Sequence, residues 1–349
     1  MANIQDVARH AGVSIATVSR VLNGTAHVNP EVMTRVRAAI DELNYQPSRA
    51  ARSLRANHSR TLGLLITDIQ NPFFTALIRG AEDVAQRNGY SLILCNSDEN
   101  ARKEQQYIEI LCAERVAGAL VVPTREHPRI LQPFHEHNIP VVIVDRRIKD
   151  DDTDAVLVDN KRGVREAVRH LYERGYRRIG IITGPKTTTT GRERLDGYRQ
   201  ALGEVGLPHD PELERFGTFK EESGHQLANE LLNLKQPIDA LFVCNNVMTM
   251  GALSALHARN LRIPEDIAIV GFDEMPWAAL SSISLTTVTQ PVYELGSTAA
   301  LRLFQRLQNP TAFTRQEIVL APTLCIRGSS RPRTQTMPLL SPSGNLTHL

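Results

Sequence analysis

The chain has 349 residues, 42% of them hydrophobic and 22% charged, with a formal net charge of +2. This length supports two or three domains, and the composition is typical of globular proteins. No apolar run reaches the length of a membrane span, so we expect no signal peptide and no membrane partner. The cysteines lack metal-ligand spacing and are predicted to be small core residues of a protein in a reducing cytoplasm: Cys95, Cys112, Cys244 and Cys325.

Positive charge is concentrated at the N-terminus. Of the 40 Lys and Arg and 38 Asp and Glu residues, the first 60 positions hold eight and four, so their net charge is +4 and that of the remainder is −2. A basic segment of this kind is what neutralisation of DNA phosphates requires.

Two short helices joined by a glycine turn are predicted in the same segment. Apolar residues recur at helical spacing from Ile4, and Gly12 breaks this first helix. Ser14 is placed to cap a second helix, which ends at Asn23. The pattern predicts a helix-turn-helix, although an ordinary helical hairpin is an equal alternative on this geometry alone.

Charge and a third helix favour the DNA-binding interpretation. Pro30 and Glu31 open a helix with an apolar face, so three helices share a small core. The second helix presents small and hydrogen-bonding side chains suited to a major groove: Ile15, Ala16, Thr17, Ser19 and Arg20. We expect Arg20 to bond a guanine, while Ile15 and Ala16 contact a thymine methyl or exclude other bases.

From Thr61 the pattern changes to alternating strands and helices. Near-continuous apolar strands separated by helices indicate a parallel sheet covered on both faces, and a second such series begins near Asn160. Two doubly wound halves with a ligand crevice at the carboxyl ends of the strands are expected. The predicted strands are 62–67, 91–95, 118–122, 140–145, 178–183, 240–244 and 267–273, and the predicted helices of the first half are 73–89, 102–115 and 130–137.

Polar side chains follow several of these strands. Each one alone is as good a candidate for the cap of the next helix. Together, a carboxylate, a guanidinium, amides and aromatic rings suit a polyhydroxylated ligand, because the rings cover its C–H faces. The residues are Asn71, Phe73, Phe74, Asp145, Arg146, Asn245, Asp273 and Gln290.

Two segments carry a family resemblance: Ile-Gln-Asp-Val-Ala-Arg-His-Ala-Gly-Val-Ser-Ile-Ala-Thr-Val-Ser-Arg-Val-Leu-Asn at 4–23 and Leu-Asn-Tyr-Gln-Pro-Ser-Arg-Ala-Ala-Arg-Ser-Leu at 43–54. They resemble the lactose-repressor (LacI/GalR) family of bacterial transcription regulators. The resemblance implies a small all-α helix-turn-helix domain plus an α/β periplasmic-binding-protein-like core of two doubly wound parallel-sheet subdomains.

The expected domains follow from this resemblance. They are a helix-turn-helix domain (1–46), a hinge helix and linker (47–59) and a two-lobed effector-binding and dimerisation core (60–330). The N-lobe comprises about 60–160 and 291–321, and the C-lobe about 161–290 and 322–330. The chain is expected to cross between the lobes near Asn160, Gln290 and Pro322. Residues 331–349, rich in Pro, Ser and Thr, are predicted to be a disordered tail.

The resemblance also implies how DNA is bound. Two copies insert Leu54 into the minor groove of a palindromic operator as a wedge that kinks the duplex, although packing of Leu54 on the core is an alternative. A homodimer reads the palindrome. Such a regulator is expected in the bacterial cytoplasm, associated with the nucleoid. Phosphate contacts are expected from Asn23, Arg49, Arg52 and Arg55.

For the effector, the resemblance implies a sugar site. It places the ligand against Phe73, Phe74, Asp145, Arg146, Arg194, Phe219, Asn245, Asp273 and Gln290. The purine-responsive branch is also similar around Asn57-His58 and Ser223-Gly224. However, residues 187–190 and Arg146 replace side chains which that branch would use. We therefore expect a sugar or a small acidic sugar derivative, given Arg146 and Arg194, with a purine corepressor as the alternative.

Enzymatic alternatives lack their motifs. No glycine-rich dinucleotide or P-loop motif occurs, and no histidine pair has metal-ligand spacing. We predict no catalytic residue, no metal and no cofactor. A sugar-processing enzyme and a DNA-packaging protein are the rival classes, and ligand-dependent DNA affinity separates all three.

Overall fold

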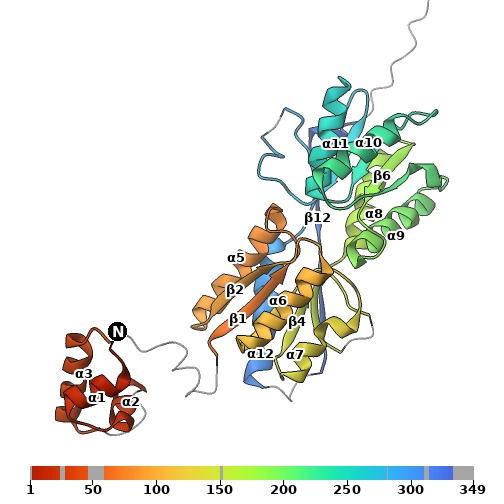
Figure 1. Cartoon of the computed structure of the whole chain (residues 1–349). Coiled ribbons are helices and arrows are strands. Elements are labelled where there is room, and N and C mark those ends of the chain that lie inside the picture. The colour runs from red at the N-terminus through yellow and green to blue at the C-terminus, as the bar shows by residue number, and fades with distance from the viewer. Residues whose placement is uncertain are drawn as a thin grey trace, which may run out of the picture. The chain divides into compact units, whose positions relative to one another are not determined.

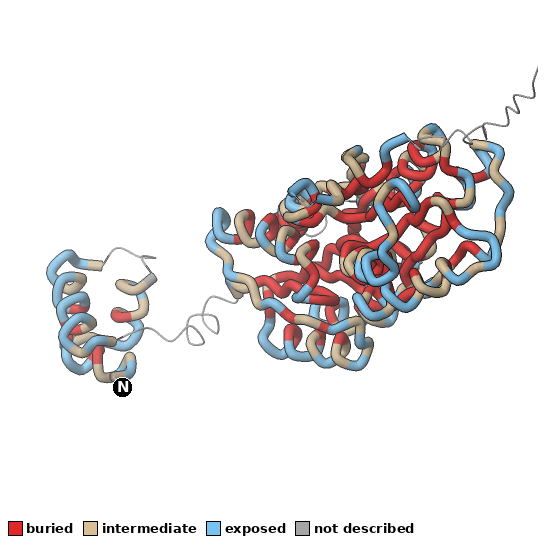
Figure 2. The backbone as a smooth tube through the Cα atoms, turned by 90° about the horizontal axis from the view of Figure 1, so that it is seen from above, coloured by how far each residue is buried: buried red, intermediate tan, exposed pale blue. Residues whose placement is uncertain are grey.

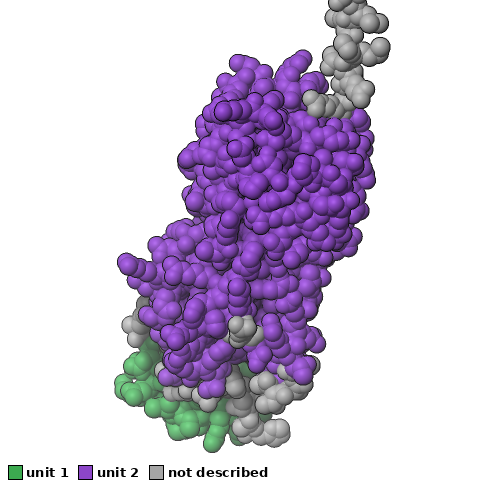
Figure 3. All heavy atoms as spheres, turned by 90° about the vertical axis from the view of Figure 1, so that its right-hand side faces the viewer, with its two compact units in different colours: residues 1–60 green, residues 61–349 purple. Residues whose placement is uncertain are grey.

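The computed structural model describes residues 2–23, 28–45, 59–149, 152–280, 282–309 and 314–332. The chain divides into two compact units at the junction of Arg60 and Thr61, coloured separately in Figure 3. None of the helices in these ranges has the length and hydropathy needed to cross a bilayer.

The first unit is a three-helix bundle: α1 (Ile4–Ala11), α2 (Ile15–Asn23) and α3 (Pro30–Glu42). Asn3 and Asp6 form a capping box at the start of α1. Gly12 ends that helix with a φ of 63°, a left-handed conformation that glycine adopts without steric cost. As predicted, the hydroxyl of Ser14 accepts from the amide of Thr17 at the start of α2, over 3.1 Å. The core consists of Val7, Ala8, Ala11, Val18, Val36 and Ala39.

The second unit contains two sheets, each with its own helices (Figure 1). The first sheet has the strand order β11-β5-β4-β3-β1-β2, and all of its pairings are parallel. Its strands are β1 (Thr61–Ile66), β2 (Ser91–Asn96), β3 (Gly118–Val121), β4 (Val141–Val144), β5 (Asp154–Val158) and β11 (Glu317–Leu320), and its helices are α5 (Pro72–Arg87), α6 (Ala101–Ala113), α7 (Gln132–Glu136) with the 3-10 turn η1 (Pro128–Leu131), and α12 (Val292–Gln308).

The second sheet has the order β12-β10-β9-β8-β6-β7. Its strands are β6 (Ile179–Thr183), β7 (Glu214–Phe216), β8 (Ala240–Val243), β9 (Ala268–Phe272), β10 (Thr286–Thr289) and β12 (Thr323–Cys325). The helices on this side are α8 (Asn160–Glu173), α9 (Thr189–Glu204), α10 (Glu221–Leu232) and α11 (Asn246–Ala258), with the 3-10 turns η2 (Pro211–Leu213) and η3 (Gly328–Ser330).

Helices cover both faces of each sheet, and the central strands between them are buried, whereas the edge strands are partly exposed (Figure 2). In the first sheet α5 and α12 pack on one face, while α6 and α7 pack on the other. α5 and α12 approach so closely that a Cβ at Gly80 would lie 2.1 Å from the carbonyl oxygen of Tyr293. Cys95, Cys112 and Cys244 are buried as predicted, but Cys325 on the edge strand β12 is only half-buried.

The chain passes between the sheets three times: between β5 and α8, between β10 and α12, and between β11 and β12. The prediction of two parallel sheets is confirmed, with one addition at an edge: β12 pairs antiparallel with β10. Only Ala321 and Pro322 separate β11 from β12, so there is no crossover helix of the kind that parallel pairing needs. The chain leaves the first sheet at the carboxyl end of β11 and enters the second sheet from the carboxyl ends of its strands. β12 therefore runs in the direction opposite to β10.

Candidate functional site

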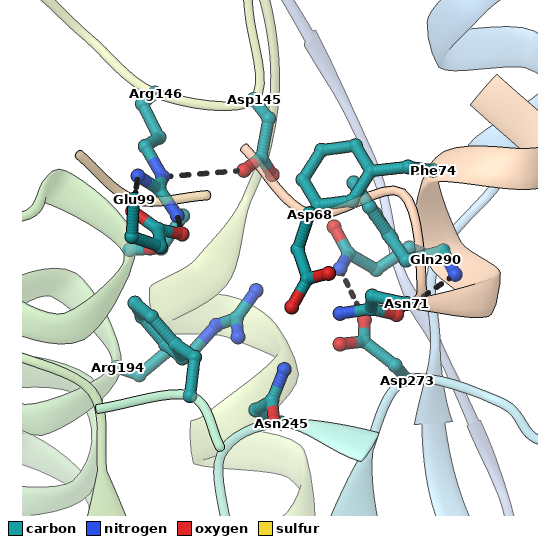
Figure 4. A pocket seen from close by; sticks show the side chains of 13 residues that line it. Asp68, Asn71, Phe74, Glu99, Asp145, Arg146, Arg194, Asn245, Asp273 and Gln290 are labelled. Carbon is teal, nitrogen blue, oxygen red and sulfur yellow. Dashed lines mark hydrogen bonds and ion pairs between the residues drawn. The ribbon is translucent and has the colours of Figure 1, made fainter. Parts of the chain in front are cut away.

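A pocket lies at the carboxyl ends of the strands of both sheets (Figure 4). All of the predicted ligand residues line it, although they come from segments far apart in the sequence. Three further residues that were not predicted also line it: Asp68, Glu99 and Thr190. The full lining is Asp68, Asn71, Phe73, Phe74, Glu99, Asp145, Arg146, Thr190, Arg194, Phe219, Asn245, Asp273 and Gln290.

Two of the strand-end residues also cap helices. The side-chain oxygen of Asn71 accepts from the amide of Phe73 at the start of α5, over 2.9 Å. Asn245 accepts in the same way from the amide of Met248 in α11, also over 2.9 Å. The capping alternative is therefore correct for both residues, and they line the pocket as well. An amide suits both tasks, because its NH2 group is a donor after the oxygen has been used.

Two buried aspartates follow β4 and β9. Asp145 and Asp273 have φ angles of 68° and 74°, a left-handed conformation that Asp and Asn tolerate better than most residues. Burial raises the pKa of Asp145 to about 6, against the nearby positive charges of Arg146 and Arg194. Burial also raises the pKa of Asp273. Each carboxylate gains from a ligand that supplies hydrogen-bond donors, because such donors replace lost water.

Gln290 fixes the position of Asp273. Its Nε2 donates to Oδ1 of Asp273. Its own Oε1 is buried and has no hydrogen-bond partner among the described residues. A buried acceptor of this kind costs free energy until a donor reaches it. The pair therefore presents acceptor atoms that a hydroxyl group would satisfy.

Arg146, at the end of β4, is held by Glu99 from the loop after β2. Its Nη1 and Nη2 donate to the two carboxylate oxygens over 2.8 and 2.6 Å. The guanidinium carbon also lies 5.5 Å from the ring centre of Phe219. The result is a planar ion pair against an aromatic ring, at a residue that the sequence analysis expected to contact the ligand.

Arg194 projects from α9 and is anchored on the side of the second sheet. Its Nε donates to Asn160 over 2.9 Å, and its Nη1 donates to the carbonyl of Cys244 over 2.6 Å. The guanidinium carbon lies 3.8 Å from the ring centre of Phe272. This stacking and bonding fix the guanidinium, whose positive charge lowers the pKa of Asp145 and of Asp273 against the larger effect of burial.

Aromatic side chains form the apolar part of the lining. The rings of Phe73 and Phe74 meet edge to face, with centres 5.0 Å apart at 89°. Phe219, from the loop after β7, is buried and has a left-handed φ of 62°. Phenylalanines together with carboxylates and amides give the mixed lining typical of small-molecule sites.

Polar bridges join the two sheets' loops at two edges of the pocket. At one edge, Lys220 pairs with Asp68 over 2.5 Å and Asn246 donates to Asn71 over 2.8 Å. In each bridge one partner follows β1 and the other belongs to the second half of the unit. These contacts break if the two halves move apart.

The other edge is bridged by α9. Arg192 and Thr189 both donate to Glu126, over 2.8 Å each. The backbone amide of Arg147 donates to the hydroxyl of Thr189 over 3.1 Å, and its guanidinium pairs with Glu193. Hydrogen bonds and ion pairs thus join the two halves at both edges, an arrangement suited to reversible movement.

The first unit exposes the predicted recognition face of α2. Ile15, Ala16 and Arg20 are exposed, and Thr17 and Ser19 are half-buried. Their contacts with DNA stay predictions. The remaining predicted DNA contacts, namely Arg49, Arg52, Leu54, Arg55 and the side chain of Asn23, lie outside the described residues.

Comparisons with known proteins identify the family. The family "Bacterial regulatory proteins, lacI family" matches residues 3–48, and "Periplasmic binding protein-like domain" matches residues 168–330. The ribose operon repressor of Escherichia coli K12 is 38% identical over 333 residues, which cover 95% of this chain and 100% of that protein. The chain belongs to the lacI family of bacterial regulatory proteins.

Other proteins of this family are similar over most of their length. The HTH-type transcriptional repressor PurR of Photorhabdus laumondii is 40% identical over 311 residues, covering 88% of this chain and 91% of that protein. A crystal structure of the lac repressor dimer bound to operator and the anti-inducer ONPF matches 95% of this chain and 99% of its own, with a TM-score of 0.82 and 27% identity. The chain is a transcriptional regulator, and these relatives exclude the enzyme class considered from the sequence.

Proposed function

We propose that the chain represses a sugar or sugar-acid utilisation operon and that a small ligand in the pocket controls its affinity for the operator. The observation that carries this proposal is the lining itself. Two buried carboxylates, Asp145 and Asp273, lie beside Arg194 and a phenylalanine cluster at the junction of two lobes. Similarity to the ribose operon repressor supports a sugar, because that protein's name ties it to ribose.

The chemistry of the lining explains how a sugar binds. Asp145 and Asp273 accept hydrogen bonds from ring hydroxyls, while Arg194 and the NH2 group of Asn245 donate to them. Phe73 and Phe74 cover the apolar C–H face of the ring. These groups come from both halves of the second unit, so one ligand bonds both halves at once.

We infer that DNA is bound by a homodimer. One recognition helix makes too few base contacts for an operator, whereas a twofold dimer reads a palindrome. Arg20 bonds a guanine, and the exposed Ile15 and Ala16 contact or exclude neighbouring bases. Leu54 enters the minor groove. Binding to operators implies a location in the bacterial cytoplasm, at the nucleoid.

The bonds that join the two halves across the pocket explain how ligand binding can change the affinity for DNA. A ligand that bonds both halves changes the angle between them and competes with or reinforces the bridges from Lys220 and Arg192. The linker joins the core at Thr61, the first residue of β1. A short hinge segment has little helical stability of its own, so a small displacement at its base orders or melts it.

A thermal-shift screen with sugars, sugar acids, sugar phosphates and purines tests the proposal. A ligand that binds only the folded protein raises the melting temperature by mass action. We expect a shift with a sugar or sugar acid, followed by a change in operator affinity whose sign separates an inducer from a corepressor. A shift with a purine alone would replace the sugar by the purine class that similarity to PurR suggests.

A further inference from the structure

Arg146 lies in the cleft, and the carboxylate of Glu99 compensates its positive charge. Its side chain is 6% exposed, and both terminal nitrogens donate to the carboxylate of Glu99. Nη1 also donates to the carbonyl oxygen of Pro123 over 3.1 Å. A bidentate pair fixes the plane of the guanidinium and occupies the edge that another carboxylate or phosphate would take. Arg146 is therefore half of an ion pair rather than a free cation.

The remaining charges of the lining disfavour an anion. Asp68 is paired with Lys220. The other two buried carboxylates of the lining are Asp145 and Asp273, and the remaining cation is Arg194; Nε of Arg146, whose terminal nitrogens are bound to Glu99, also lies 3.8 Å from Oδ2 of Asp145. Burial raises the pKa of Asp145 to about 6 in spite of the positive charges of Arg146 and Arg194, which lower it, and the charge of Asp273 raises it further. An anionic ligand would bring a further negative charge into a site where charge repulsion is poorly screened.

Two buried atoms in the lining have no hydrogen-bond partner among the described residues: Nε of Arg146 and Oε1 of Gln290. The first is a donor and the second an acceptor. Figure 4 shows Arg146 with Glu99 on one side and Asp145 on the other, so its Nε faces the space next to Asp145. Hydroxyl groups donate and accept, and so satisfy both atoms, whereas a carboxylate or phosphate group only accepts.

We propose that Glu99 is a specificity-determining residue: it cancels the charge of Arg146, so that the cleft selects an uncharged polyhydroxylated ligand and rejects sugar acids and sugar phosphates. This inference rests on the proposed sugar response and narrows it to uncharged sugars and polyols. In this arrangement Arg146 acts through its Nε–H, as a donor to a hydroxyl group.

Two variants test whether Glu99 selects ligands by compensating the charge of Arg146 or only holds the Arg146 side chain in place. Glu99→Gln keeps the size of the side chain but leaves the guanidinium with a full positive charge. The double variant Glu99→Gln/Arg146→Gln removes both charges and restores neutrality. Glu114→Gln is the matched control, because it removes an exposed carboxylate at the end of α6, outside the lining. If Glu99 only positioned Arg146, the single variant would weaken neutral and anionic ligands alike.

The assay uses the full-length protein and matched pairs of aldoses and aldonates, such as D-ribose with D-ribonate and D-glucose with D-gluconate, together with D-ribose 5-phosphate. Thermal shift selects the pair that binds, and calorimetric titration then gives the ratio of the two dissociation constants. We expect the wild type to prefer the aldose at least tenfold. Glu99→Gln should shift this ratio towards the anion by roughly tenfold or more, because one buried charge is removed next to the ligand.

The double variant should regain the preference for the aldose, and Glu114→Gln should keep the wild-type ratio. A wild type that binds the aldonate or the phosphate as tightly as the aldose overturns the inference and leaves the sugar response intact; this result stands even if Glu99→Gln does not fold. An unchanged ratio in Glu99→Gln also overturns it. If only purines bind, the proposed sugar response is wrong, and the inference about Glu99 fails with it.

Discussion

Asp145→Asn should stabilise the ligand-free protein while it weakens effector binding. Asp145 is buried, and its pKa is raised from 3.8 to about 6, mainly by desolvation. A carboxyl group whose pKa is raised in the folded state contributes stability at low pH and loses it as the pH rises through the folded pKa. At pH 7 the ionised carboxylate therefore lowers the stability of the fold, and an uncharged isostere removes this cost.

The magnitude follows from the shift of about 2 pKa units. At about 1.36 kcal/mol per unit, the free energy of unfolding at pH 7 should rise by about 3 kcal/mol in Asp145→Asn. At pH 4, where Asp145 is protonated in the fold, the same substitution should change it by less than about 1 kcal/mol. Asn also adopts the left-handed φ of 68° at this position without added strain.

Urea unfolding at pH 7 and at pH 4 measures both values, and titration with the effector measures the loss of binding. The control is Asp152→Asn, which changes an exposed aspartate of the same lobe and should stay within about 0.5 kcal/mol of the wild type at both pH values. Our reasoning is refuted if Asp145→Asn destabilises the protein at pH 7, or if the gain is equally large at pH 4.

Three further predictions address the ligand and the DNA. Asp273→Ala should abolish the effector response while ligand-free operator binding persists; equal loss of both would give Asp273 a structural role. Leu54→Ala should reduce operator affinity and DNA bending in gel-shift and circular-permutation assays, and unchanged bending would contradict the wedge. Arg20→Ala should cost about 1–3 kcal/mol at one guanine of the operator, measured by competition with substituted operators. A uniform loss over all sequences would instead assign Arg20 to a phosphate.

The sequence was sufficient to place the pocket because parallel strands have a fixed direction. Every polar residue directly after a buried strand lies at the same edge of its sheet, so Asp145, Asn245 and Asp273 were found by this rule alone. Asp68 and Glu99 lie two and three residues beyond the ends of β1 and β2, so the rule as stated does not reach them. Thr190 carries no such signal, because it lies in the first turn of α9.

What the sequence did not predict are the pairings between side chains. The loop after β2 brings Glu99 to Arg146 across 47 positions of the chain, and α9 brings Arg192 to Glu126 across 66. Neither pairing has a local pattern, since both depend on how the loops of adjacent strands pack. Whether a carboxylate compensates the positive charge of Arg146 was therefore open at the level of sequence, and with it the preference between neutral and acidic ligands.

Burial of the two carboxylates lowers the stability of the ligand-free protein, and the same burial strengthens their hydrogen bonds to a ligand. Asp145 and Asp273 lose hydration in the fold, and Oε1 of Gln290, which has no hydrogen-bond partner within the described ranges, adds a further cost in the ligand-free protein. A hydroxyl-rich ligand donates a hydrogen bond to each of these acceptors. The free energy lost by burying them unsatisfied is thereby recovered and contributes to the free energy of binding. Since these groups lie where the two halves meet, that gain depends on the angle between the halves. Buried, undersatisfied acceptors are thus a physical means by which a small neutral ligand can favour one arrangement of the lobes over another.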